Sequence, residues 1–323
     1  MHDPLVELTP APAVPLHPAV ATARTAVVAA LRDVLAIPDD ALERPWRWRP
    51  TDEDDVDVRY GIYRLHEGLE EAIGAVERGR AAAERSSEEH LSAATRPGRP
   101  AIPPLAAATA ARWDLSGVLI PLTAADLDAA PGGGEWTVRR TLGHIVTSQR
   151  SYGWTSAWFL HRASEAGAGE YPPEGAIPPD GDEEEDGQGS VDEVLERLGT
   201  LVDAAIEHFA ALHRVQLLTP GRWSGLPVTI DFRLGRLGSH IREHTIQVDK
   251  TLAMTGRTPT ETARLVRLIA GSYGRLEGLV IGRDRDDLDR PLGGGPSAAG
   301  ILGSATRDVA ATAANARSAA TTG

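Results

Sequence analysis

The chain has 323 residues, of which 41% are hydrophobic and 24% are charged, and this composition is typical of a globular protein. Its formal net charge of −13 argues against a nucleic-acid partner, because nucleic acids are bound by basic surfaces. The chain contains no cysteine, which excludes disulfides, cysteine-ligated metals and cysteine nucleophiles. No apolar run approaches the roughly 20 residues of a membrane span, and the first residues lack the pattern of a secretory signal. We therefore expect a cytoplasmic protein without a membrane partner.

Apolar residues spaced three and four apart predict helices along most of the chain. The predicted ranges are 19–37, a helix from 58 onward, 105–122, 137–162, 190–212, 230–255, 259–282 and a final helix after 297. Residues 1–17 are rich in proline and predict an extended arm. The stretch 94–104 is expected to be a linker, because several prolines interrupt helical hydrogen bonding.

Two of these helices have a recognisable start. Ser190 and Glu193 form an S-x-x-E capping box, and Thr258 and Glu261 form another. No alternating strand pattern extends beyond a few residues, so the predicted fold is all-α. Four helices joined by turns predict an up-and-down bundle over residues 105–255. The two helices before this bundle and the two after it could form a second bundle that is poor in histidine.

An acidic segment, residues 164–189, separates two helices of the predicted bundle. Six acidic side chains occupy the seven positions 180–186. Because like charges repel and few apolar groups offset the entropy of ordering, we expect this segment to be solvated, mobile and dispensable for folding.

Two histidines on one predicted helix indicate a metal site. His240 and His244, in GSHIREHTIQV, are four residues apart and therefore lie one above the other on the helix. His244 falls in the apolar stripe between Ile241 and Val248, and buried imidazoles need partners because unpaired polar groups are costly. His144, in TLGHIVTSQ on the second helix of the same bundle, is the candidate third ligand, since facing helices bring side chains together in the core.

Other polar residues on the His240 helix are candidates for the same site. Glu243 could orient a ligand or accept a proton as a catalytic residue, although a solvated glutamate on the helix surface is an equally good interpretation. Arg242 and Gln247 could line the mouth of the site.

Two of these stretches resemble a known family. EWTVRRTLGHIV, residues 135–146, is similar to the start of the second helix in the DinB-like superfamily, and GSHIREHTIQV is similar to its fourth helix. The resemblance covers roughly residues 100–282. The resemblance implies a four-helix bundle in which His144, His240 and His244 bind zinc, nickel or iron. The superfamily includes mycothiol-dependent maleylpyruvate isomerases and bacillithiol transferases. The expected organisation is an arm and helical pair over 1–95, the DinB-like bundle over 100–256 and a helical pair over 257–323.

The expected activity follows from the ligand set. Three neutral imidazoles leave coordination positions open, where a thiol or water would become more acidic. Because the chain has no cysteine, a thiol would come from a cosubstrate, and the resemblance together with the alanine- and arginine-rich, GC-rich coding bias implies mycothiol. The hypothesis is a metal-dependent thiol transferase, isomerase or hydrolase acting on a small molecule. The alternative is a non-catalytic metal- or ligand-binding bundle that acts as an interaction module. A homodimer is the candidate assembly.

Overall fold

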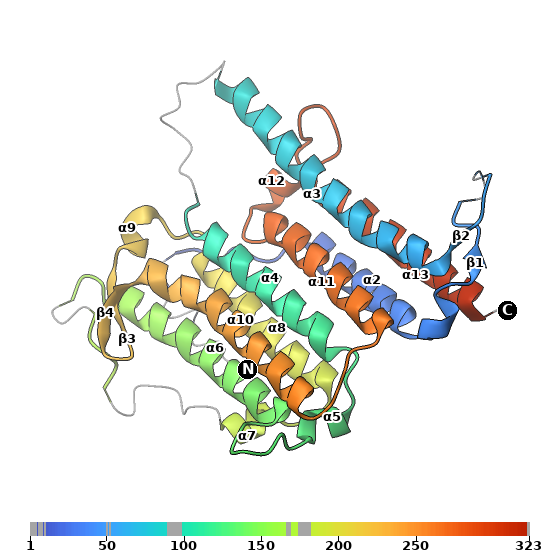
Figure 1. The fold of residues 1–323 in the computed structure, drawn as a ribbon. Helices are drawn as coiled ribbons and strands as arrows, with labels where there is room; N and C mark the ends of the chain where they lie inside the picture. The colour runs from blue at the N-terminus through green and yellow to red at the C-terminus, as the bar shows by residue number, and fades with distance from the viewer. Residues whose placement is uncertain are drawn as a thin grey trace.

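The computed structural model describes residues 5, 9, 11–49, 51, 53–88, 99–165, 169–173 and 182–321. Its architecture is helical apart from two short hairpins, which confirms the predicted all-α class (Figure 1). The long helices are α2 (Pro18–Leu35), α3 (Val58–Glu88), α4 (Ile102–Leu119), α6 (Val138–His161), α8 (Val191–Phe209), α10 (Ile230–Met254), α11 (Glu261–Val280) and α13 (Ala298–Thr321). The short elements are η1 (Asp39–Ala41), α5 (Ala124–Asp128), α7 (Glu183–Asp186), α9 (Arg214–Leu217), α12 (Arg285–Asp289), β1 (Pro45–Trp46), β2 (Val56–Asp57), β3 (Pro220–Trp223) and β4 (Leu226–Thr229).

Helices α4, α6, α8 and α10 form the predicted four-helix bundle. Each contributes buried apolar side chains to one core, such as Leu115, Ile145, Ile206 and Ile241. Helix α10 packs against both α4 and α6, and α8 packs against the same two helices, which closes the ring. The N-terminal arm lies on this bundle, where the Val14 N–H donates to a carbonyl of α8.

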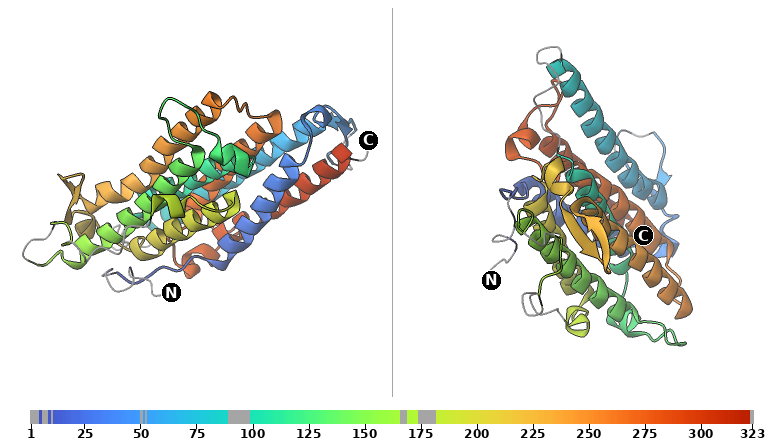
Figure 2. Two further views of the ribbon diagram at one scale, coloured as in Figure 1. Left: turned by 90° about the horizontal axis from the view of Figure 1, so that it is seen from below. Right: turned by 90° about the vertical axis from the view of Figure 1, so that its left-hand side faces the viewer.

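Helices α2, α3, α11 and α13 share a second core beside the first (Figures 1 and 2). Val27, Ile62, Ile269 and Ala313 are buried in it, one from each helix. The N-terminal and C-terminal helical pairs therefore pack together, although they are far apart in the sequence. This is the second bundle that the helix count allowed.

A buried carboxylate joins the two bundles. Glu277 of α11 has no solvent-exposed surface and accepts hydrogen bonds from the guanidinium of Arg112 at 2.8 Å and the indole of Trp113 at 3.0 Å, both on α4. Arg24 of α2 also donates to Glu277, at 2.8 Å, and to Asp203 of α8, at 2.6 and 2.8 Å. The two arginines balance the two carboxylates, so the cluster is neutral as a whole.

The positive charges decide the ionisation of Glu277. Burial alone would raise the pKa of this carboxyl, but the guanidinium groups of Arg112 and Arg24 lower the pKa below its ordinary value. Glu277 is therefore ionised at neutral pH. A buried charge of this kind depends on its partners, because an unpaired one would have to be neutralised.

Three local expectations need correction or refinement. Pro103 and Pro104 lie in the first turn of α4 rather than in a linker, because the first turn of a helix does not use the N–H groups that proline lacks. The side chain that caps α11 belongs to Thr260, not Thr258. The expected turn after α9 is the hairpin β3–β4, and both residues at its tip, Ser224 and Gly225, have positive φ, as tight hairpin turns require.

In the described part of the chain, no helix has the length and apolarity that a membrane crossing needs. Residues 94–98 of the expected linker, the preceding residues 89–93, and residues 166–168 and 174–181 of the acidic segment lie outside the described ranges.

The Glu277→Gln variant tests the junction between the bundles. It removes the charge but keeps the side-chain size, so Arg112 loses a buried counter-ion. We expect the free energy of unfolding at neutral pH to fall by about 3–5 kcal/mol, measured by urea denaturation. Because the folded-state pKa of Glu277 is lowered, this difference should be present above the unfolded pKa of about 4.3 and shrink as the pH falls through the folded-state pKa.

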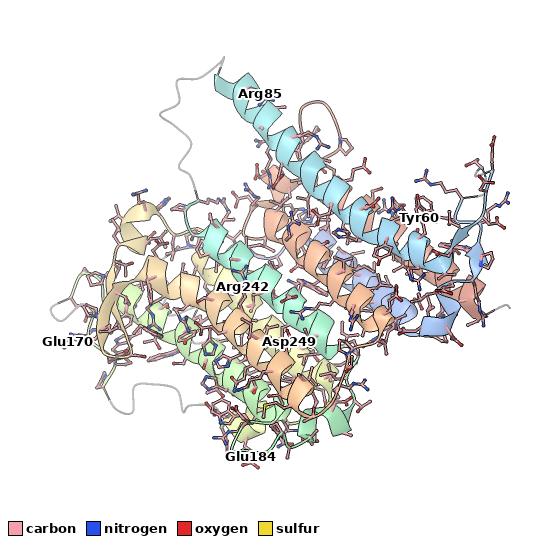
Figure 3. The ribbon with its side chains drawn as sticks, viewed as in Figure 1. Tyr60, Arg85, Glu170, Glu184, Arg242 and Asp249 are labelled. Carbon is pink, nitrogen blue, oxygen red and sulfur yellow. The ribbon has the colours of Figure 1, made fainter. Side chains whose placement is uncertain are left out.

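Glu184→Gln is the matched control, since Glu184 is exposed on α7 (Figure 3). An equal loss of stability in the two variants, or an equal loss at pH 7 and pH 3, would contradict the assignment of Glu277 as the buried charge that joins the bundles.

Candidate metal centre

Helix α10 presents two imidazoles toward α6. Thr229 caps its N-terminus, accepting a hydrogen bond from the Phe232 N–H. The helix lies close to the α4 backbone at Gly238, where a Cβ atom would be 2.9 Å from the Ala108 nitrogen. His240 and His244 project toward α6, and His240 is only 4% exposed. The predicted spacing therefore places both rings at one helix–helix interface.

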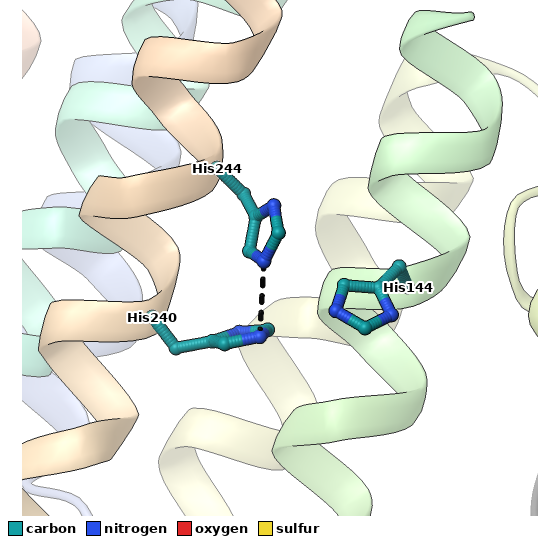
Figure 4. A group of neighbouring side chains, drawn as sticks. All are labelled: His144, His240 and His244. Atoms are coloured by element: carbon teal, nitrogen blue, oxygen red, sulfur yellow. Dashed lines mark hydrogen bonds between the residues drawn. The ribbon is translucent and has the colours of Figure 1, made fainter. Parts of the chain in front are cut away.

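The third imidazole comes from α6 and completes a cluster (Figure 4). His144 faces His240 and His244, with ring centroids 5.1 and 4.7 Å from theirs. One ring nitrogen from each residue lies within 4.8 Å of the other two, and the Nε2 atoms of His240 and His244 are 3.0 Å apart. The structure thus brings together all three histidines that the sequence singled out, in a group that can hold a metal ion.

Hydrogen bonds to the outer ring nitrogens orient two of the imidazoles. Nδ1 of His144 is 2.7 Å from a carboxylate oxygen of Glu183, and Nδ1 of His244 is 2.7 Å from the amide oxygen of Gln247. Both oxygens are acceptors, so each Nδ1 carries the proton and each Nε2 keeps its lone pair for the cluster. Such bonds from the outer nitrogen are the usual way in which proteins orient a metal-binding histidine.

Residues 182–189 of the acidic segment are part of the site, so the expectation of a solvated, mobile loop is wrong for them, while their dispensability for folding stays a prediction. Asp182 caps the short helix α7, which carries Glu183 at one end and Asp186 at the other. Asp186 is buried and accepts two hydrogen bonds of 2.6 Å from Arg150 and one of 2.6 Å from Thr147, both on α6. Burial would raise the pKa of Asp186, but its bonds to Arg150 and Thr147 lower it.

A glycine explains how α7 reaches the histidine. Gly143 lies directly before His144, and a Cβ atom there would be 1.8 Å from the carbonyl oxygen of Glu183. Only glycine allows the α7 backbone this close to α6, and the approach carries the Glu183 carboxylate to His144. A glycine in the interior of an otherwise regular helix was the signal in the sequence for this contact.

Glu243, the predicted catalytic residue, is paired with an arginine of its own helix. Its carboxylate accepts bonds of 2.8 and 2.9 Å from the guanidinium of Arg236 on the same helix, and its side chain is 56% exposed. The bond from Arg236 lowers the pKa of Glu243, which makes it a weaker base. A catalytic role for Glu243 stays a prediction. Of the other candidates, Gln247 contacts the site as described, whereas Arg242 extends toward a carbonyl of α4.

Two aromatic rings flank the cluster, one just before α6 and one on it. Trp136 lies edge-on to His144, and Tyr152 lies edge-on to His240, each with centroids 5.3 Å apart. Burial, followed by the proximity of His244 and His144, lowers the pKa of His240 to about 3, and burial also lowers the pKa of His244. These two imidazoles are neutral at physiological pH, the form in which histidine binds metals.

The donor set fits a divalent transition metal. Two nitrogens that each lie about 2.0–2.1 Å from one tetrahedral zinc ion are separated by about 3.3 Å, close to the 3.0 Å between the two Nε2 atoms of α10. Nδ1 of His240 is buried and has no hydrogen-bond partner among the described residues, so the ring is incompletely satisfied by the protein alone. Nitrogen ligands suit zinc, nickel, copper and iron, and the geometry does not select among them.

A four-helix bundle with three inward-facing imidazoles is the architecture of a histidine-based metal site. Residues 107–248 match the sequence model of the DinB superfamily, so this bundle is similar to the bundle of that superfamily. The match runs from α4 to α10 and includes all three histidines, so it confirms the resemblance found in the sequence. Searches of curated proteins and of solved structures found no match to this chain.

Two glutamates near the site provide a matched test. Glu183→Ala removes the group that orients His144, and we expect it to lower the affinity for cobalt by about 10–100-fold. Glu243→Ala removes a carboxylate that is bonded to Arg236, and we expect a much smaller change. Competition titration with a chelating indicator measures both affinities; a larger loss in the Glu243 variant would overturn the assignment of Glu183.

The three histidines should also act as one unit. Replacing His144, His240 or His244 with alanine leaves two imidazoles, so each single variant should lose most of its bound metal and a double variant should lose little more. Elemental analysis of protein purified without an affinity tag measures the occupancy. His161→Ala, at the exposed end of α6, is the control. Full occupancy in His144→Ala would exclude the three-histidine site.

Proposed function

We propose that the protein is a metal-dependent enzyme in which His144, His240 and His244 hold a divalent transition metal that activates a low-molecular-weight thiol of the mycothiol type. A metal bound by three neutral imidazoles supplies a Lewis acid with open positions, and it lowers the pKa of a thiol or of water. The reaction class would be transfer or isomerisation on a small molecule, with the sulfur as the nucleophile. The protein has no cysteine, so the thiol has to enter as a cosubstrate.

The observation that carries this proposal is the incomplete ligand set. The cluster found among the described residues consists of three histidines, whereas closed structural zinc sites use four protein ligands. The side chain of His144 is 25% exposed, so the cluster is accessible from the α6 side while His240 stays buried behind it. Glu183 and Gln247 keep the Nε2 atoms of their histidines directed inward, which leaves the exposed side for a substrate.

Cobalt-substituted protein tests the activation of a thiol directly. Adding mycothiol, or 2-mercaptoethanol as a simple thiol, should produce a saturable sulfur-to-cobalt charge-transfer band in the near-ultraviolet spectrum. A neutral alcohol of the same size should leave that region unchanged, and the His240→Ala variant should show no band. The Glu243→Ala variant should retain the band, since its carboxylate is bonded to Arg236.

A cobalt-loaded protein that binds no thiol would contradict the proposal. If such a protein then hydrolysed small esters or amides, the site would use water instead. If it neither bound thiols nor catalysed hydrolysis, the bundle would be a metal-binding interaction module.

A further inference from the structure

A cavity lies away from the histidines, between the two bundles. It has a volume of about 600 Å³ and opens where the C-terminal ends of α2, α4 and α10 meet the start of α11. Asp249 of α10, which lines it, lies on the part of the helix beyond His244 (Figure 3). Pockets that bind small molecules usually have volumes of about 300–1,000 Å³. The cavity is therefore large enough for a ligand of its own.

The walls of this cavity are mainly apolar. Ile37 just after α2, Val118 from α4 and Leu252 from α10 are all buried core residues that line it. Pro38 and Pro259 add rigid rings to the lining. Because the walls come from both bundles, an apolar group bound here would contact both cores.

Hydrogen bonds and ion pairs fix the polar edge of the cavity. Asp39 accepts bonds from the N–H groups of Glu261 and Thr262 at 2.8 and 3.0 Å, and so ties the end of α2 to the start of α11. Arg267 of α11 binds Asp114 of α4 at 2.9 Å and Asp249 of α10 at 3.0 Å. The cavity is thus built into the packing of the helices and needs no rearrangement to form.

One cation on this edge lacks a direct partner. Of the three arginines that line the cavity, Arg267 is paired as described and Arg257 lies 3.5 Å from Asp126. The guanidinium of Arg264 has no hydrogen bond or ion pair within the described ranges, and it acts on Asp39 only through its charge. Asp39 already accepts bonds from Glu261 and Thr262, so the guanidinium of Arg264 remains available to an anion.

We propose that this cavity binds a small monocarboxylic acid whose apolar body fills the space between the bundles and whose carboxylate pairs with Arg264. A guanidinium binds a carboxylate through two parallel hydrogen bonds, which gives the ligand a fixed orientation. A cationic amphiphile would place its charge beside the guanidinium of Arg264, the one arginine of the lining that no described carboxylate pairs with, and is disfavoured. The site is separate from the three histidines and does not depend on the function proposed for them.

Decanoate is a suitable probe, with 1-decanol and decyltrimethylammonium as neutral and cationic counterparts. Isothermal titration of the full-length protein should show saturable binding of decanoate, weaker binding of decanol and no binding of the cation. Arg264→Gln should weaken decanoate binding by about tenfold and change decanol binding less than twofold. Arg307→Gln, at an exposed position on α13 that does not line the cavity, should leave both unchanged.

A second variant tests the location without disturbing the core. Ala253 is exposed and lines the cavity, so Ala253→Trp should block the binding of both decanoate and decanol while the melting temperature stays near that of the parent. The spectrum of the cobalt-substituted protein should not change on adding decanoate, because the ligand lies away from the histidines. Failure of decanoate to saturate, equal affinity in Arg264→Gln and parent, or a shift of the cobalt spectrum would each overturn the proposal.

Discussion

The buried carboxylate of Glu277 is the interaction on which the arrangement of the two bundles depends. It accepts hydrogen bonds from side chains of α2 and α4, and Arg24 extends the same cluster to Asp203 on α8. A charge without solvent contact is tolerated only where its partners are fixed, so the cluster determines how α11 lies against α4. Helix α4 in turn packs against α10, and α10 carries two of the three histidines. The second bundle is in this way part of the support of the metal centre, although it contributes no histidine to it.

The metal centre itself is built by two helices and a short acidic helix. Helices α6 and α10 supply the imidazoles, and α7 supplies the carboxylate that orients His144. The bonds of Asp186 to Arg150 and Thr147 hold α7 in place, and Gly143 gives it room. These contacts explain why α7 is ordered despite its charge. The carboxylates at its two ends, Glu183 and Asp186, bond to side chains of α6, and Glu184 between them is exposed to solvent. A ligand set with a fixed outer layer and one accessible side suits catalysis better than a purely structural role.

Sequence patterns predicted the local features well and the long-range ones poorly. The Ser190–Glu193 capping box, the bundle helices and the His240–His244 pair follow from spacing along single helices, and the structure confirms them. The place of His144 beside this pair followed from the predicted bundle and the family resemblance, and the structure bears it out. The role of Glu183 could not be read from spacing, because it depends on a contact with His144 across 39 residues of chain. Glu243 had the better position in the sequence, but its side chain turns to Arg236, which lies two turns earlier on the same helix. Charge repulsion predicted disorder for the acidic run because the contact of Asp186 with Arg150 on α6 is visible only in the fold.

The central claim is that three imidazoles converge on one metal ion, and anomalous X-ray diffraction tests it most directly. Crystals of the cobalt-loaded protein, measured on both sides of the cobalt absorption edge, should show one strong anomalous peak. It should lie about 2.0–2.2 Å from Nε2 of His144, His240 and His244, with the Nδ1 atoms of His144 and His244 still bonded to Glu183 and Gln247. A fully occupied peak elsewhere, or a protein that binds cobalt with the three rings turned apart, would contradict the account.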